Sequence, residues 1–279
     1  MSVESANGPI GSRIAALLHT LTPKAKQPVS ATVLKNWIAQ AEGKLGPEAK
    51  GGRLGWLIAS SVAIAAVQRA IDADGRQLFL LKGGTLLQHR LNATARPTKD
   101  VDGLIRGDLD AFLLTLEDAL VEPWGPLTLR RGEVEVVNVP TKLIKPRRFD
   151  IIIEMRGVTW RRIQFEVSPD EAGIGSDFEA IEPPPLSGFG LPDPDSLIGI
   201  AMRFQIAQKF HAVSDPHDPP PPSMTVLATW STCSFCVISQ RRRPARPFPR
   251  FEMRARRCLR PAPTKPNNSA TRTGRGRRL

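Results

Sequence analysis

The chain has 279 residues, which is enough for one large domain or two small ones, and its 41% hydrophobic and 24% charged residues are ordinary for a globular protein. A net charge of +12 would favour a nucleic-acid partner, but the excess is confined to one end of the chain. Residues 221–279 contain thirteen arginines and Lys265 against Glu252, which leaves 25 basic and 26 acidic residues before them. The nearly neutral first 220 residues exclude a basic binding face that covers the whole domain.

Cysteine content and apolar runs bear on where the protein works. All three cysteines, Cys233, Cys236 and Cys258, lie in the basic end, so a disulfide framework is excluded and a reducing compartment is expected. Zinc is not expected there, because a fourth ligand at a plausible spacing is absent. The first twelve residues lack a signal-peptide pattern, and the apolar run Leu54–Val67 has 14 residues where a bilayer needs about 20. We therefore expect a cytoplasmic protein with no membrane segment.

The first predicted elements are helical. A helix is predicted from Ser30 to Glu42, with Ser30 at its cap and apolar residues at helical spacing behind it. Glycines and Pro47 then predict a linker over 43–52. A second helix is predicted from Arg53 to Ala73, and because it is apolar almost all round we expect it at the centre of a core.

A strand, a glycine turn and a helix follow in that order. The continuous apolar run 78–81 is typical of a buried strand, and Lys82-Gly83-Gly84-Thr85 forms the turn. Apolar residues at helical spacing come directly after it. The turn is therefore expected between the end of a buried strand and the first residues of a helix.

The next segments alternate between strands and one helix. Alternation over Thr98–Ile105 predicts a second strand, and Asp110–Leu120 is predicted as a helix. Further strands are predicted at Glu133–Val139, Arg148–Glu154 and Arg162–Val167.

The last predicted element is a long helix, with Asp193 at its cap and Pro194 at its first position, that runs to about Ala212. Four prolines at 219–222 follow, and periodic patterning then largely stops. The predicted organisation is an N-terminal helical segment over 1–50, a core with the late helix over 51–215, and a Pro/Arg-rich disordered tail over 216–279.

The glycine turn has the chemistry of an anion site. Gly83 and Gly84 allow a tight turn and a close approach of backbone N–H groups to an anion, and the start of the next helix adds a positive dipole end. Lys82 and Thr85 add a charge and a hydroxyl group. Taken alone, the same residues are also typical of a purely structural turn.

Asp100 and Asp102 make the functional interpretation stronger. Side chains two apart on a strand point to the same face, so the two carboxylates converge and repel each other unless cations neutralise them. Carboxylate oxygens suit Mg²⁺ (or Mn²⁺), which is commonly shared with substrate phosphates. The alternative is a pair of solvated acids at a strand end, with Lys99 and Arg96 as partners.

These residues carry a family resemblance. The run from Leu78 to Ile105, with a Lys-Gly-Gly-Thr turn, a helix and then Thr-x-Asp-x-Asp, resembles the signature of the nucleotidyltransferase AbiEii/AbiGii toxin family of the DNA polymerase beta-like superfamily. The resemblance covers roughly residues 50–215. It implies an α+β fold (α/β-like) with a mixed β-sheet core flanked by helices, a bound nucleoside triphosphate and a divalent metal. It also implies a toxin of a toxin–antitoxin or phage-defence pair, with an antitoxin as partner.

The resemblance also implies further site residues. A third carboxylate is expected on a neighbouring strand, and the strand Arg162–Ser168 resembles the family pattern and favours Glu166, while Asp150 is the alternative. Either acid could instead pair with a neighbouring arginine. Lys209 is similar to a family lysine near the end of a late helix that faces the nucleotide, and a snorkelling surface lysine is its alternative.

The sequence thus predicts a Mg²⁺-dependent nucleotidyltransferase that moves a nucleoside monophosphate to RNA or protein. Two candidate site groups are expected: catalytic Asp100, Asp102, Glu166 and Asp150, of which Asp100, Asp102 and Glu166 bind the metal, and nucleotide-binding Lys82, Gly83, Gly84, Thr85, Lys99 and Lys209. The alternatives are a catalytically disabled nucleotide- or RNA-binding protein and a partner-binding module on the same scaffold. After the late helix the family pattern is lost, which suggests a frameshifted tail; reading the other two frames beyond codon 220 tests this hypothesis.

Overall fold

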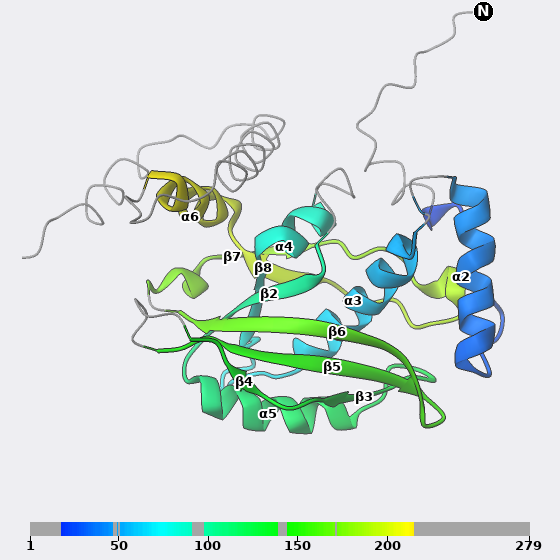
Figure 1. Cartoon of the computed structure of the whole chain (residues 1–279), viewed down its shortest axis with the longest axis horizontal. Coiled ribbons are helices and arrows are strands. Elements are labelled where there is room, and N and C mark those ends of the chain that lie inside the picture. The colour runs from blue at the N-terminus through cyan, green and yellow to red at the C-terminus, as the bar shows by residue number, and fades with distance from the viewer. Residues whose placement is uncertain are drawn as a thin grey trace, which may run out of the picture. The chain divides into compact units, whose positions relative to one another are not determined.

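A computed structural model of the chain describes residues 18–46, 49, 51–90, 98–138, 144–170 and 172–214, with 212–214 described by their backbone alone (Figure 1). Contacts divide the chain into two units, Met1–Gln240 and Arg241–Leu279, and all described residues belong to the first. The predicted tail over 216–279, its cysteines and Arg96 lie outside the described residues.

The first unit is built on one mixed sheet of eight strands. The strands are β1 (Phe79–Lys82), β2 (Asp100–Ile105), β3 (Thr128–Arg131), β4 (Glu135–Val136), β5 (Arg147–Met155), β6 (Val158–Pro169), β7 (Phe178–Ile181) and β8 (Leu197–Ile200). Their order is β3-β5-β6-β2-β1-β8-β7, and β4 also pairs with β5. Pairs β2–β6 and β1–β8 are parallel and the others are antiparallel, so the predicted mixed sheet is confirmed.

Helices flank this sheet, as predicted. They are α2 (Ala31–Leu45), α3 (Arg53–Val67), α4 (Gly83–Arg90), α5 (Leu109–Val121) and α6 (Met202–Ser214), with short 3₁₀ turns η2 (Ile174–Ser176) and η3 (Ser187–Phe189). Ser30 caps α2, since its hydroxyl oxygen accepts the Val33 N–H at 3.3 Å. The second helix ends earlier than expected, because the chain after Val67 turns back on itself and Ile71 pairs with Gln77.

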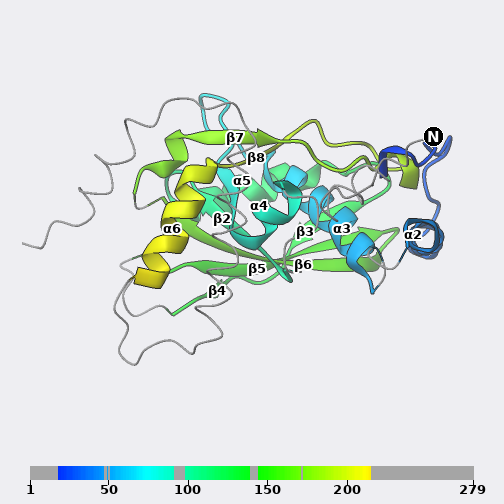
Figure 2. The ribbon, with the colours of Figure 1, turned by 90° about the horizontal axis from the view of Figure 1, so that it is seen from above.

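The two faces of the central strands differ sharply. On one face Phe165 stacks with Phe149 at 5.8 Å between ring centroids and meets Phe79 edge-on at 5.6 Å, and all three rings are buried. Helices α3 and α5 cover this face, because Arg161 and Arg131, which point to the same side, contact them. In both views α2 and α6 lie at opposite ends of the sheet (Figure 1, Figure 2). The opposite face carries the polar residues of the candidate site, next to the buried side chains of Leu80 and Leu104.

The predicted long helix from Asp193 to Ala212 is wrong in its first half. Leu197–Ile200 forms β8, which lies between β1 and β7, and the helix begins only at Met202. Asp193 does not cap a helix; its carboxylate accepts the N–H groups of Leu186 and Ser187 in the preceding loop. The four-residue apolar run is buried throughout, and such a run fits a helix and a central strand equally well.

The prediction missed three short strands. The edge strands β3 and β7 and the inner strand β8 have four residues each. The strand expected at Glu133–Val139 is reduced to the two residues of β4. Short edge strands carry little periodic signal, so neighbouring strands decide where they form.

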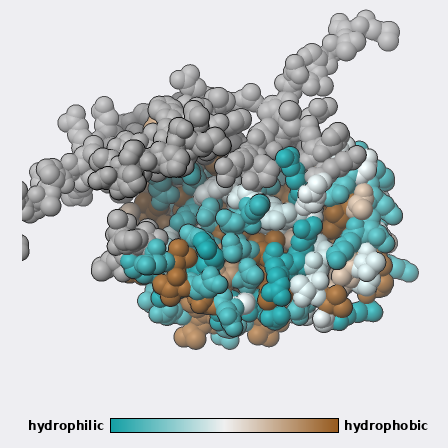
Figure 3. All heavy atoms as spheres, in the orientation of Figure 1, coloured by the Kyte–Doolittle hydropathy of each residue, from teal (hydrophilic) through white to brown (hydrophobic). Residues whose placement is uncertain are grey.

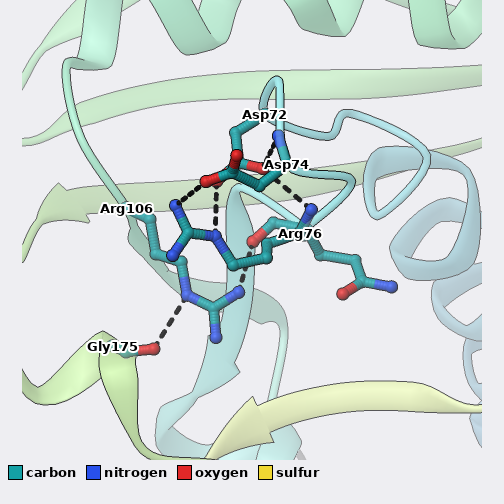
Figure 4. A network of polar contacts seen from close by, with 6 residues as sticks. Asp72, Asp74, Arg76, Arg106 and Gly175 are labelled. Atoms are coloured by element: carbon teal, nitrogen blue, oxygen red, sulfur yellow. Dashed lines mark hydrogen bonds and ion pairs between the residues drawn. The ribbon is translucent and has the colours of Figure 1, made fainter.

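A polar network holds the far end of β2. Arg106 follows the strand directly and donates to the carbonyl oxygens of Gln77 and Gly175 at 2.8 Å each (Figure 4). Its guanidinium also lies over the ring of Phe178. Beside it, Asp72 accepts from both the backbone and the side chain of Arg76. This network fixes the last residue of β2, and Asp100 and Asp102 lie at the other end of the same strand.

The surface adds two observations. Within the described residues, no helix combines the length and the apolar composition that a membrane crossing needs. On the face drawn in Figure 3, hydrophobic residues lie in small groups among hydrophilic ones. Exposed apolar side chains include Leu114 and Val121 of α5, at 73% and 80% exposure.

Candidate active site at the glycine turn

The turn between β1 and α4 fits closely against a carboxylate of β2. Gly83 has φ +67°, the left-handed conformation that favours glycine. A Cβ atom at this position would stand 2.0 Å from Oδ2 of Asp102. The missing side chain at Gly83 is therefore what allows the turn and the carboxylate to lie together.

Both glycine N–H groups already have partners. The Gly83 N–H donates to Oε1 of Gln205 at 3.1 Å, and Nε2 of Gln205 donates back to the Gly83 carbonyl oxygen at 3.2 Å. The backbone N–H of Gly84 interacts with the Asp102 carboxylate and lowers its pKa. The predicted role of the two glycines in holding phosphate stays a prediction, and in this structure their N–H groups serve to fix the turn.

Two threonine hydroxyls tie the turn to the start of β2. Thr85 is fully buried, and its hydroxyl donates to the Asp100 carbonyl oxygen at 2.6 Å. The Thr98 hydroxyl donates to the same oxygen at 3.2 Å. Thr85, predicted as a phosphate ligand, is thus engaged with the main chain of Asp100 and positions the strand that carries the acids.

Strand register gathers the predicted acids on one face. Asp100 and Asp102 share it because they are two residues apart on β2, and cross-strand partners point to the same side. The parallel pairing of β2 with β6 sets Asp102 opposite Glu166 and Asp100 opposite Gln164. The residues of this acidic face are Lys82 on β1, Asp100 and Asp102 on β2, Gln164 and Glu166 on β6, and Arg148 and Asp150 on β5.

The surroundings of the Asp102 carboxyl shift its pKa. Burial raises the pKa of its carboxyl, and the nearby Glu166 and Asp100 raise it further, while Lys82 and the Gly84 N–H oppose the shift. The ionised form of Asp102 is therefore disfavoured where it stands. A cation bound at this carboxylate would relieve that cost.

Glu166 and Asp150 occupy different places on the acidic face. Glu166 is the direct neighbour of Asp102 on the next strand, about 4.8 Å across the backbone. Asp150 lies one strand further, opposite Gln164. The register places Glu166 closer to the pair, although neither acid is thereby assigned a role.

Arg148 neutralises Glu166. Its Nη2 lies 2.8 Å from Oε2 of Glu166, with the two side chains 39% and 36% exposed. The hydrogen bond and charge of Glu166 raise the pKa of Arg148, and Glu135 and Asp100 contribute in the same direction. Arg148 thus lies among the acids. The ion pair agrees with the alternative prediction that Glu166 pairs with a neighbouring arginine.

The three predicted lysines lie in different settings. Lys82 is half-buried opposite Asp102, and its Nζ donates to the Ser168 hydroxyl at 2.6 Å. Lys99 is exposed next to Asp100. Lys209 is half-buried on α6, one turn beyond Gln205. Lys82 is the lysine that the described contacts bring directly to the acids.

With the geometry established, similarity to known proteins identifies the family. Residues 65–220, more than half of the chain, match the family described as "Nucleotidyl transferase AbiEii toxin, Type IV TA system". The chain belongs to this AbiEii family. The matched segment contains the glycine turn, the acidic face and α6.

Solved structures are similar only at a distance. The AbiEii chain matches the nucleotidyltransferase toxin MenT4 from Mycobacterium tuberculosis H37Rv at 16% identity and a TM-score of 0.42, over 66% of this chain and 59% of MenT4. The chain therefore spans about three fifths of the length of that toxin. It also matches the antibiotic-resistance factor ANT(2″)-Ia at 13% identity and a TM-score of 0.35, over 74% of this chain and 94% of the other. No curated protein sequence matches.

The donor set of this AbiEii chain fits a hard divalent cation by its chemistry. Asp100, Asp102 and Glu166 offer carboxylate oxygens from one face, and the raised pKa of Asp102 marks a place where positive charge is needed. Among the described residues, no three acidic, histidine or cysteine side chains already stand in a metal-binding arrangement. In this structure the Glu166 carboxylate is instead paired with Arg148.

Sequence reasoning missed two residues of this site. Gln205 lies far from the turn in the sequence and carries no motif, so only the folded chain reveals its contact with Gly83. The sequence indicates Arg148 only as one of several arginines that could form an ion pair with Glu166 or Asp150. Arg148 and Asp150 are two residues apart on β5 and share one face of the strand. Only the register of β5 against β6 shows that this face is the acidic one.

Proposed function

We propose that this chain is a Mg²⁺- or Mn²⁺-dependent nucleotidyltransferase that moves a nucleoside monophosphate from a nucleoside triphosphate to a hydroxyl group of RNA or protein. The observation that carries the proposal is the placement of Asp100, Asp102 and Glu166 on one face, beside a glycine turn that lies against the Asp102 carboxylate. Family membership supports the same reaction class.

In this proposal Asp100, Asp102 and Glu166 hold the cation. When bound, the cation supplies positive charge that neutralises the triphosphate and the charge that develops during transfer. Asp150 is the acid of this face that remains, and it takes the proton of the acceptor hydroxyl. The acceptor oxygen forms a bond to the α-phosphorus, the bond to the leaving oxygen breaks, and pyrophosphate departs.

Positive groups of the chain orient the triphosphate. Lys82, already beside Asp102, is the closest of them to the acids, and Lys99 and Lys209 add charge at the edges of the site. The positive end of α4 contributes in the same sense. Gly83, Gly84 and Thr85 act by holding this end of the helix against β2.

We further propose that the chain acts as the toxin of a toxin–antitoxin or phage-defence pair in the cytoplasm, with a cognate antitoxin as its partner. The family description supports this role. RNA and protein are both proposed as acceptors, because residues 1–220, with 25 basic and 26 acidic residues, have no excess of positive charge that would select RNA.

The decisive experiment is label transfer. The full chain is incubated with each α-³²P-labelled nucleoside triphosphate, Mg²⁺, and total cellular RNA and protein, with EDTA as the control. Radioactivity that becomes covalently attached to an RNA or protein species, and that EDTA prevents, is the expected result. Absence of label with all four nucleotides, in both Mg²⁺ and Mn²⁺, contradicts the proposal.

The Arg148–Glu166 ion pair favours one second candidate: a catalytically disabled nucleotide-binding protein on the same scaffold. An arginine that permanently occupies the third carboxylate would allow triphosphate to bind without transfer. Metal-dependent binding of triphosphate in a thermal-shift assay, without any transfer of label, would support this candidate over the enzyme.

A further inference from the structure

Gln205 joins two parts of the chain that are far apart in sequence. Its side chain is 1% exposed, and its amide makes two hydrogen bonds to the main chain of Gly83, one in each direction. A glutamine amide is suited to this contact because it accepts and donates at the same time. Both main-chain groups of Gly83, in a half-buried turn, are thereby satisfied by one side chain.

Apolar residues next to Gln205 pack α6 against α4. Leu87 of α4 and Met202 and Ile206 of α6 form a small buried cluster separate from the main core. At the other end of α4, Arg90 forms an ion pair with Glu179, whose second carboxylate oxygen accepts the Met202 N–H at 3.3 Å. Helix α6 is therefore fixed to both ends of α4, and Gln205 is its contact with the turn.

The Gly83 peptide is also the point at which the turn meets Asp102. Gly83 is left-handed, and a Cβ atom added to it would stand 2.0 Å from Oδ2 of Asp102, so the turn lies directly against this carboxylate, with which the next N–H, that of Gly84, interacts. A rotation of the Gly83 peptide would move that N–H away from the carboxylate. The contact between Gln205 and Gly83 thus controls how Asp102 is held.

We propose that Gln205 is a positioning residue of the cation and nucleotide site, which acts by locking the Gly83 peptide so that Gly84 orients Asp102. The proposal rests on the function proposed above. It makes α6 a structural part of the active site, since the helix fixes the turn by a side chain that touches neither the acids nor a substrate.

The test compares Gln205→Met with Gln208→Met, the same substitution at an exposed position of the same helix. Gln205→Asn is the second variant, because its shorter amide retains the chemistry but cannot reach both groups of Gly83. Three properties of the full chain are measured: Mn²⁺ binding by electron paramagnetic resonance, amide hydrogen exchange at residues 83 and 84, and folding by circular dichroism.

Gln205→Met and Gln205→Asn are expected to weaken Mn²⁺ binding roughly tenfold and to speed exchange at Gly83 and Gly84, while Gln208→Met matches the unsubstituted chain. Mn²⁺ affinity within twofold of the control in both folded variants overturns the proposal. If the unsubstituted chain binds no Mn²⁺, the proposed function fails instead. The exchange rates then decide alone, and equal rates in Gln205→Met and Gln208→Met overturn the role of Gln205.

Discussion

Asp102 and Glu166 are cross-strand partners on the adjacent parallel strands β2 and β6, so their carboxylates share one face of the sheet. Each has a different neighbour on its other side: Lys82 stands opposite Asp102, and Arg148 stands opposite Glu166. Two acids are thus bracketed by two cations across four strands. A divalent cation that binds these carboxylates must compete with both positive side chains.

Gly83→Ala should disturb both the fold and the site. The new Cβ would stand 2.0 Å from Oδ2 of Asp102, in a backbone conformation that disfavours alanine. Gly107→Ala is the matched control, since Gly107 has φ +79° but its added Cβ meets nothing within 4 Å. We expect Gly107→Ala to cost about 1–2 kcal/mol of unfolding free energy from the backbone alone. The clash in Gly83→Ala should add about 1–3 kcal/mol. Equal losses in urea titrations of the two variants would contradict the packing described at Gly83.

Glu166→Gln and Asp150→Asn distinguish the two candidates for the third carboxylate. Because Glu166 is the direct neighbour of Asp102 and Asp150 lies one strand further, we expect Glu166→Gln to weaken Mn²⁺ binding by roughly tenfold or more, about 1.4 kcal/mol. Asp150→Asn should leave the affinity within about twofold while it slows transfer, since it is assigned to the proton of the acceptor. The reverse order of Mn²⁺ affinities would make Asp150 the ligand.

Arg148→Met should strengthen cation binding. Arg148 competes with a metal ion for Glu166, and its removal frees that carboxylate. The ion pair is more than a third exposed, so its contribution is at most about 1 kcal/mol, and the expected gain in Mn²⁺ affinity is no more than about fivefold. Arg130→Met, which breaks the exposed pair with Glu154, is the control and should change nothing. Weaker Mn²⁺ binding in Arg148→Met would show that the arginine supports the site instead.

His89 should make the fold sensitive to mild acid. It is buried on α4, neither ring nitrogen has a hydrogen-bond partner among the described residues, and burial lowers its pKa to about 4. The unfolded chain therefore binds a proton below about pH 6.5 that the folded chain accepts only near pH 4. The free energy of unfolding therefore decreases by up to about 3 kcal/mol as the pH falls from 6.5 to 4.

Urea unfolding at pH 7.5 and pH 5 measures this effect of His89. His89→Met should flatten the difference between the two pH values, whereas His19→Gln, at an exposed histidine, should retain it. A His89→Met variant as acid-sensitive as the unsubstituted chain would show that other groups cause the loss of stability.

The parts of the site that lie close together in sequence could be predicted from it. The glycine turn follows directly on β1, and Asp100 and Asp102 are two residues apart on a strand, so local geometry alone places each motif. The fold class followed from the order of these elements and the family resemblance. What brings turn and acids together is the antiparallel pairing of Lys82 with Asp102, which agrees with their short separation in the chain.

Contacts between distant segments could not be predicted. The run Leu197–Ile200 becomes a strand because β1 and β7 offer partners on both sides, and that information lies outside the run itself. For the same reason the partnership of Gln205 with Gly83 and that of Arg148 with Glu166 depend on the completed sheet. Choosing between Glu166 and Asp150 needed the register of β5, β6 and β2, which a single sequence does not specify.

The central claim is that Asp102 holds the cation on which nucleotide transfer depends, and the most direct measurement is label transfer by Asp102→Asn beside the unsubstituted chain. Asparagine keeps an acceptor for the Gly84 N–H and removes a charge that burial disfavours, so the variant should fold at least as stably in urea titrations. We expect transfer of α-³²P-labelled nucleotide to fall by about 10²–10³-fold, because the loss of one preorganised group that stabilises charge in the transition state typically costs that much. Transfer by the folded Asp102→Asn variant at the rate of the unsubstituted chain would contradict the claim.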